Sequence, residues 1–285
     1  MTATFPGAGE GRDDPTAAPR AGSRCHPGLA PYRPVRDELL GLPPGQWIAH
    51  CNRLAESRRL RSAAGAPLRF VASLEPQGAL GYEAAIFHHG RVACRSDGRG
   101  ALHDLHNALV WLTFPAVKAA LNRLHLESAA GGDGGGRGPV RDVATLLDES
   151  GLLWLSADTS LDARLQAGDW RGLLVDNRER LARQVRPIVI GHGLLEKLAA
   201  PYKAMTAHCL ACRAVPDGSV ATPAGDPCDG HAAACLAAAF AGGRVPKLAP
   251  LPILGLPGWD PANVDPSYYE DARVFRARQP LRPTP

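Results

Sequence analysis

The chain has 285 residues, of which 45% are hydrophobic and 21% are charged, and its formal net charge is +4. This balance is typical of a globular protein with a sizeable core and excludes a chain that is mainly disordered or coiled coil. The charge is too small to indicate a nucleic-acid partner, and no apolar run is long enough to span a bilayer. Seven cysteines, without the spacing of a small secreted scaffold, favour a reducing cytoplasm.

Length alone suggests one large domain or two small ones, and composition predicts flexible ends. Residues 1–30 are rich in Ala, Pro, Gly and charge, which predicts a disordered leader. The domain is expected to span residues 31–278 and to be followed by a flexible tail at 279–285. A Gly-rich segment at 129–138 is predicted to be a flexible loop within it.

Helices and hairpins are both predicted along this domain. In chain order, periodicity predicts a helix at 47–60, a strand at 68–74 and a hairpin that pairs 82–88 with 91–95. A helix follows His103, and a second helix restarts at Pro115 and runs through Leu124. Next come a hairpin that pairs 143–147 with 152–156 and helices at 161–167, 177–186, 193–198 and 232–240. Residues 250–259 contain three prolines and can form neither a regular helix nor a central strand. The mixture predicts an α+β fold rather than alternating βαβ units.

The greatest density of reactive side chains is the run from His103 to Asn107, with sequence HDLHN. In a helix, His103, Asn107 and Trp111 share one face, because residues four apart are neighbours. On that face His103 could act as general base or metal ligand, with Asp104 orienting it and Asn107 donating to an oxyanion. Capping explains the spacing equally well: Asp104 is a good N-cap, Asn107 could reach back to it, and His106 would then be solvated.

A second candidate is the pair formed by His192 and Glu196. These residues are four apart and share a helix face, which suits a metal-binding pair or an acid–base pair. The alternative is an exposed contact at a helix start, which contributes little to stability. Asp148-Glu149 is a lesser candidate pair, and it is predicted to lie in the β-turn of the second hairpin.

The cysteines suggest a third site. Cys209 and Cys212 form a CxxC pair, and fifteen residues later Cys228 and His231 form a CxxH pair. This is the spacing of a structural zinc site. Cys235 complicates the ligand set, and buried cysteines in an Ala-rich helix also serve as small apolar residues.

Several stretches together resemble an uncharacterised bacterial family, domain of unknown function 3025. They are Tyr82-Glu83, Arg95, His103-Asp104, Asn107 to Trp111, Phe114-Pro115, Lys118, Arg141-Asp142, Thr145, Asp148-Glu149, Gly151, Trp170, Gly191-His192, Glu196-Lys197, Pro250 to Trp259, Tyr269, Asp271 and Arg276. The resemblance spans roughly residues 32 to 278 and implies one domain with the Gly-rich segment as a loop insertion. It brings no activity, and the cysteine pairs do not belong to its pattern.

Two functional hypotheses follow from these residues. The first is a metal-assisted hydrolase with His103, Asp104 and Asn107 on one wall of a pocket and His192 with Glu196 on the other, where a divalent metal such as zinc activates water for attack on a phosphoester or amide. The second is a non-catalytic cytoplasmic binding or structural protein, with zinc held by Cys209, Cys212, Cys228 and His231. The first requires His103 and His192 to converge in space.

Overall fold

The computed structural model describes residues 26–43, 45–73, 78–96, 98–130, 138–213 and 228–276. Most of the predicted leader, the centre of the Gly-rich segment and the tail lie outside the described residues. The leader is predicted too long at its end, since residues 27–30 begin a 3-10 helix, Pro27–Tyr32, whose Leu29 is buried. Tyr32 donates a buried hydrogen bond to the carbonyl of Val189, which fixes this segment to the core.

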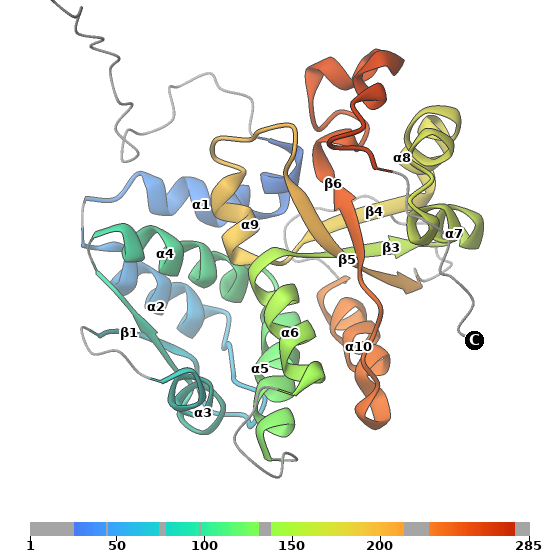
Figure 1. Ribbon diagram of the computed structural model, residues 1–285. Helices are drawn as coiled ribbons and strands as arrows, with labels where there is room; N and C mark the ends of the chain where they lie inside the picture. The colour runs from blue at the N-terminus through green and yellow to red at the C-terminus, as the bar shows by residue number, and fades with distance from the viewer. Residues whose placement is uncertain are drawn as a thin grey trace, which may run out of the picture.

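The described chain is a mixed α+β domain, as predicted (Figure 1). Its α-helices are α1 (Arg33–Leu40), α2 (Trp47–Ser57), α3 (Ala79–His89), α4 (Gly98–Thr113), α5 (Pro115–Ala130), α6 (Pro139–Ser150), α7 (Thr159–Ala167), α8 (Arg178–Gln184), α9 (His192–Lys197) and α10 (Cys228–Phe240). Its strands are β1 (Arg69–Ala72), β2 (Arg91–Cys94), β3 (Gly151–Ser156), β4 (Val185–Val189), β5 (Thr206–Arg213) and β6 (Ala249–Pro252).

Two sheets organise these elements. The larger has the order β4-β3-β5-β6, with β3 antiparallel to β4 and parallel to β5, and β6 antiparallel to β5. Every residue of β3 is buried, as expected for a central strand. The proline-containing β6 lies at an edge, where the missing backbone N–H groups of its prolines are tolerated. The smaller sheet is the parallel pair β1–β2.

Both predicted hairpins are wrong. Residues 82–88 belong to α3, which ends at Gly90 in the left-handed conformation, φ +66°, and β2 then pairs with β1. Residues 143–147 belong to α6, whose Val140, Val143, Ala144 and Leu147 have the i, i+3, i+4, i+7 spacing of one helix face. Short apolar runs of this kind cannot be separated into strand and helix by alternation alone.

Helices α1 to α6 lie on one side of the larger sheet together with the short helix α9, whereas α7 and α8 lie away from them, beside β3 and β4 (Figure 1). Helix α4 packs against α9, and α6 packs against both α9 and α5. The start of α5 is fixed by Asp229 of α10, whose carboxylate accepts from the backbone N–H groups of Ala116 and Val117 at 2.8 and 3.0 Å. This packing brings α4, α5, α6 and α9 together around one point. None of the described helices is long and apolar enough to cross a membrane.

Candidate metal centre

His103 and His192 meet in the structure although 89 positions separate them. Their Nε2 atoms are 2.9 Å apart and their ring centroids 4.4 Å apart, with the rings edge to face. His103 lies on α4 and His192 is the first residue of α9, directly after β4 and Gly191. The convergence that the hydrolase hypothesis requires is therefore present.

Three carboxylates surround this histidine pair. Glu149 Oε1 lies 3.6 Å from His192 Nε2, and Glu196 Oε2 lies 3.2 Å from His103 Nδ1. Asp148 Oδ2 faces His192 Nδ1 at 3.9 Å. His103, Glu149 and His192 each offer a ligand atom within 4.8 Å of the others. Among the residues that the structure describes, this is the one group of three or more His, Cys, Asp or Glu side chains so closely gathered.

Glycines allow α6 and α9 to approach closely enough to form this group. A Cβ atom on Gly191 would lie 2.4 Å from the backbone N of Gly151, which directly follows α6. A Cβ atom on Gly193 would lie 2.8 Å from Glu149 Oε2. Both distances are shorter than a side chain tolerates, so glycine at these positions holds the end of α6 against the start of α9. The acidic pair at the end of α6 is thereby placed beside His192.

Burial and charge set the protonation of the inner residues. Burial lowers the pKa of His192 to about 4, so its imidazole is neutral at pH 7 and can act as a ligand. Burial opposes ionisation of Asp148, but the Lys118 ammonium and two nearby histidines outweigh it and lower that pKa to about 2. Burial raises the pKa of Glu149, while the neighbouring His103 opposes the shift. Lys118 itself is buried and donates to Asp148 Oδ1 at 2.5 Å.

The donor set fits a divalent transition metal. Two imidazole Nε2 atoms and one carboxylate are a common ligand set for catalytic zinc, and also for iron in some oxygenases. Zinc–nitrogen bonds of about 2.0–2.1 Å in a tetrahedral site place two nitrogens about 3.3 Å apart. The observed 2.9 Å between the Nε2 atoms needs only a small separation of the rings to reach this value. His103 also has the carboxylate at its second ring nitrogen that metal-binding histidines usually have.

Comparison with known proteins places the chain in a family. A family model described as "Protein of unknown function (DUF3025)" matches residues 68–279, which is most of the chain. The chain belongs to this DUF3025 family. No curated protein and no solved structure matches it. The family match carries no activity, so the function of this DUF3025 protein has to be argued from the site.

Two of the predicted site residues make other contacts. Asp104 binds Arg95 through both carboxylate oxygens, at 2.7 and 2.8 Å, and accepts from its backbone N–H. It therefore does not orient His103. It is not an N-cap either, because α4 begins six residues earlier, at Gly98. Asn107 donates to the Tyr82 hydroxyl at 2.8 Å rather than to the histidine pair.

His106 is buried rather than solvated. Its Nδ1 atom lies 2.8 Å from the carbonyl of Leu102, one helical turn earlier. Burial lowers its pKa, and the contact with Leu102 opposes the shift. His106 is therefore a hydrogen-bonded core residue of α4.

The structure does not gather the four predicted zinc ligands at one point, although His231 lies 3.4 Å from Cys235 Sγ and Cys212 also contacts Cys235. Cys209 and Cys212 are three residues apart in β5, and successive side chains of a strand alternate between faces, so the two thiols point to opposite sides of the sheet. On α10, Cys228 accepts from Arg186 at 2.7 Å, while His231 contacts the carbonyl of Arg213 at 2.6 Å. Burial raises the pKa of both β5 thiols. They are core residues in this arrangement.

Sequence reasoning did not place Asp148, Glu149 or Lys118 in the predicted site, although all three fall on the stretches that resemble the family. The acidic pair was expected in a turn, yet it occupies the last turn of α6 and faces the histidine pair. The helical spacing of Val140, Val143 and Leu147 is the signal that would have placed it correctly. No local pattern marks Lys118, because its burial depends on the packing of α5 against α6.

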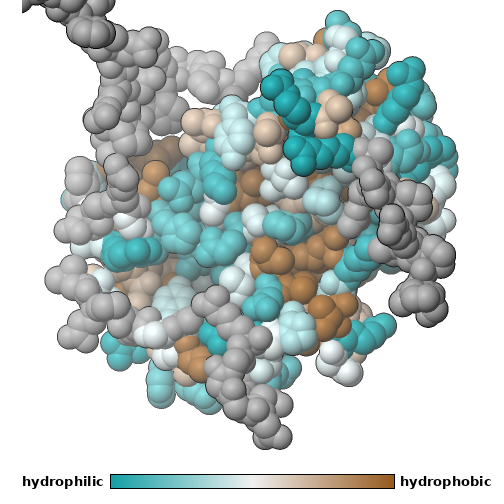
Figure 2. All heavy atoms as spheres, viewed as in Figure 1, coloured by the Kyte–Doolittle hydropathy of each residue, from teal (hydrophilic) through white to brown (hydrophobic). Residues whose placement is uncertain are grey.

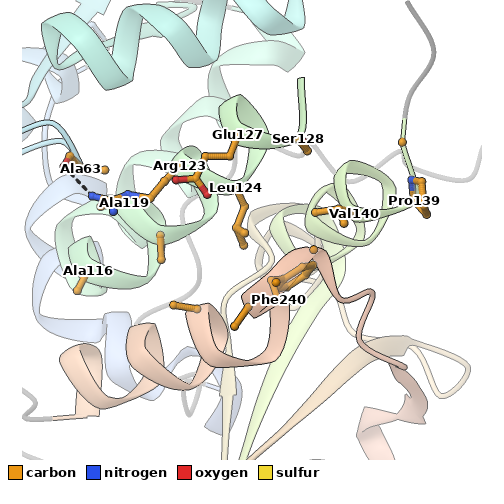
Figure 3. Close-up of a pocket in the computed structure, with 16 residues that line it drawn as sticks. Ala63, Ala116, Ala119, Arg123, Leu124, Glu127, Ser128, Pro139, Val140 and Phe240 are labelled. Atoms are coloured by element: carbon orange, nitrogen blue, oxygen red, sulfur yellow. Dashed lines mark hydrogen bonds between the residues drawn. The ribbon is translucent and has the colours of Figure 1, made fainter. Parts of the chain in front are cut away.

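A sizeable hollow in the described surface lies away from the histidine pair (Figure 3). It has a volume of about 870 Å³ and is formed by α5, α6 and the end of α10. Small and apolar residues such as Ala119, Leu124, Val140 and Phe240 line it, and none of the histidine pair or its carboxylates does. Figure 2 shows apolar surface around α6 and α10. The hollow lacks the chemistry of the histidine site and is not the candidate centre.

Proposed function

We propose that this DUF3025 protein is a metal-dependent hydrolase whose metal is held by His103, His192 and Glu149. The observation that carries the proposal is the 2.9 Å approach of the two Nε2 atoms, with the Glu149 carboxylate 3.6 Å from one of them. The three residues come from α4, α9 and α6. The close packing of these helices does not by itself explain why two imidazoles and a carboxylate meet at one point.

Partial exposure supports a catalytic rather than a structural centre. The side chains of His103 and Glu149 are 31% and 49% exposed, whereas His192 is 7% exposed. Structural zinc sites are closed by four protein ligands, while catalytic sites have three and leave a position open to water or substrate. One buried and two partly exposed ligands match the second pattern.

Each residue has a defined role in this proposal. A divalent metal would lower the pKa of a bound water and polarise the substrate, which suits hydrolysis of a phosphoester or an amide. His103 and His192 supply nitrogen ligands, and Glu149 supplies a carboxylate. Glu196 accepts a hydrogen bond from His103 Nδ1 and so presents the Nε2 lone pair to the metal. Glu196 is thus a positioning residue.

Activity measurements test this proposal. We expect the purified protein to hydrolyse a chromogenic phosphodiester, phosphomonoester or anilide in the presence of zinc or manganese, and to lose that activity with a chelator. His192→Ala and Glu149→Gln should each lower kcat by at least about 100-fold, because each removes a ligand of the water-activating metal. Asn107→Leu, which changes the same face of α4 outside the ligand set, serves as the control. Equal activity in the wild type and in His192→Ala would contradict the proposal.

A further inference from the structure

We infer that Asp148, fixed by Lys118, is the positioning residue for His192, as Glu196 is for His103. This inference rests on the proposed function and adds a second outer carboxylate to the centre. Asp148 lies in the last turn of α6 and Lys118 in the first turn of α5.

The two histidines have equivalent surroundings. Each directs Nε2 toward the other ring and Nδ1 toward a carboxylate, Glu196 at 3.2 Å for His103 and Asp148 at 3.9 Å for His192. Lys118 binds Oδ1 of Asp148 and leaves Oδ2 facing His192. The Nδ1 atom of His192 is buried and makes no hydrogen bond of normal geometry to a described side chain or backbone group, although the backbone of Asp148 also lies beside the ring and opposes the lowering of the pKa of His192. A buried N–H or lone pair of this kind normally has a hydrogen-bond partner, and the carboxylate that it faces is that of Asp148.

Metal binding would close the remaining gap. The two Nε2 atoms must separate by about 0.4 Å to reach the nitrogen spacing of a tetrahedral zinc site. The two nitrogens of an imidazole point in nearly opposite directions, so a movement of His192 away from His103 shortens the distance from Nδ1 to Asp148. The contact would then approach the hydrogen bond that ligating histidines usually donate to a carboxylate.

The location of Lys118 argues against a purely stabilising ion pair. A buried lysine loses its hydration, and a cation in the first turn of a helix is also disfavoured by the helix dipole. Buried ion pairs often contribute little to stability when compared with an apolar pair of similar size. A role in holding the Asp148 carboxylate toward His192 explains why the pair lies at this position.

The test removes both charges at once. The double variant Lys118→Met/Asp148→Leu leaves no unpaired buried charge, and it is expected to fold. Asn122→Leu is the matched control, because it removes a buried polar contact one turn along α5 that reaches Glu83 and not His192. Circular dichroism and melting curves verify folding. Zinc affinity is measured by competition with a chromophoric chelator, and the Nδ1–H proton resonance of His192 is recorded in the zinc-bound full chain.

We expect the double variant to bind zinc at least about tenfold more weakly than the wild type, and Asn122→Leu to bind it normally. In the zinc-bound wild type, the Nδ1–H proton of His192 should exchange slowly with water and resonate downfield, and this hydrogen-bonded signal should be lost in the double variant. An unchanged zinc affinity or an unchanged Nδ1–H signal in the double variant overturns the inference while leaving the proposed function standing. Absence of zinc binding by the wild type overturns the proposed function and the inference with it.

Discussion

His103 contacts residues that lie far away in the chain, His192 and Glu196 of α9, and its side chain is one-third exposed. The role of such a residue depends on these distant contacts and cannot be inferred from its own helix alone. The sequence indicated His103, His192 and Glu196 because two of them are four apart and because all three fall on the family pattern. It could not show that the carboxylate grouped with both rings, that of Glu149, comes from α6, since that depends on the tertiary contact between α6 and α9.

A second residue of interest is Glu83, which lies on α3 and accepts from Asn122 at 2.7 Å. Burial, reinforced by the charge of Asp148, raises its pKa to about 7. The folded state therefore holds a proton on Glu83 between pH 4.5 and 7, where the unfolded chain has released it. Stability linked to this group is present below pH 4.5 and is lost as the pH rises through 7.

Replacing Glu83 by Gln should remove this pH dependence. We expect the free energy of unfolding of Glu83→Gln, relative to wild type, to rise by about 2 kcal/mol between pH 5 and pH 8. Urea unfolding at several pH values measures it. His192, whose pKa is lowered to about 4 by burial, makes stability rise with pH between 4 and 6.5 in both proteins, so the difference isolates Glu83. A difference that stays constant with pH would show that Glu83 is ionised throughout.

At the level of elements, the contact between α6 and α9 decides whether the centre forms. Periodicity located most helices, including α2, α5 and α9, because their apolar residues recur at helical spacing. It failed at α3 and α6, each of which directly precedes a strand. Gly90 and Gly151 at their ends looked like hairpin turns in sequence. One of them is instead a left-handed helix cap, and the other is extended backbone that enters β3.

Two glycine substitutions separate packing from metal binding. Gly191→Ala places a Cβ against the backbone of Gly151 and should lower the free energy of unfolding by about 2–3 kcal/mol, because backbone cannot move aside. In Gly193→Ala the Cβ lies 2.8 Å from the end of the flexible Glu149 side chain and 3.1 Å from the Glu149 carbonyl oxygen, so we expect a smaller loss of stability, about 1 kcal/mol. By displacing Glu149, it should nevertheless weaken zinc binding by about tenfold. Normal zinc affinity in Gly193→Ala would argue against Glu149 as a ligand.

Across the whole molecule, the α+β class follows from composition and the mixture of periodicities, whereas the topology does not. The parallel pairing of β3 with β5 spans α7, α8, β4 and α9, and no local pattern indicates such a connection. The cysteine spacing is the opposite case, in which a local pattern predicts a site that the fold does not form. It matches a zinc motif in the sequence, but the alternation of β5 sends Cys209 and Cys212 to different faces. The metal prediction therefore moves from the cysteines to the histidine pair.

Zinc stoichiometry of the purified protein tests the central claim most directly. Wild type, His192→Ala and Cys209→Ser are each titrated with zinc, and bound metal is counted after removal of excess. We predict one tightly bound zinc per chain in wild type and in Cys209→Ser, and loss of this zinc in His192→Ala. Of the two variants, only His192→Ala removes a ligand of the proposed centre. Zinc retained by His192→Ala and lost from Cys209→Ser would contradict the account.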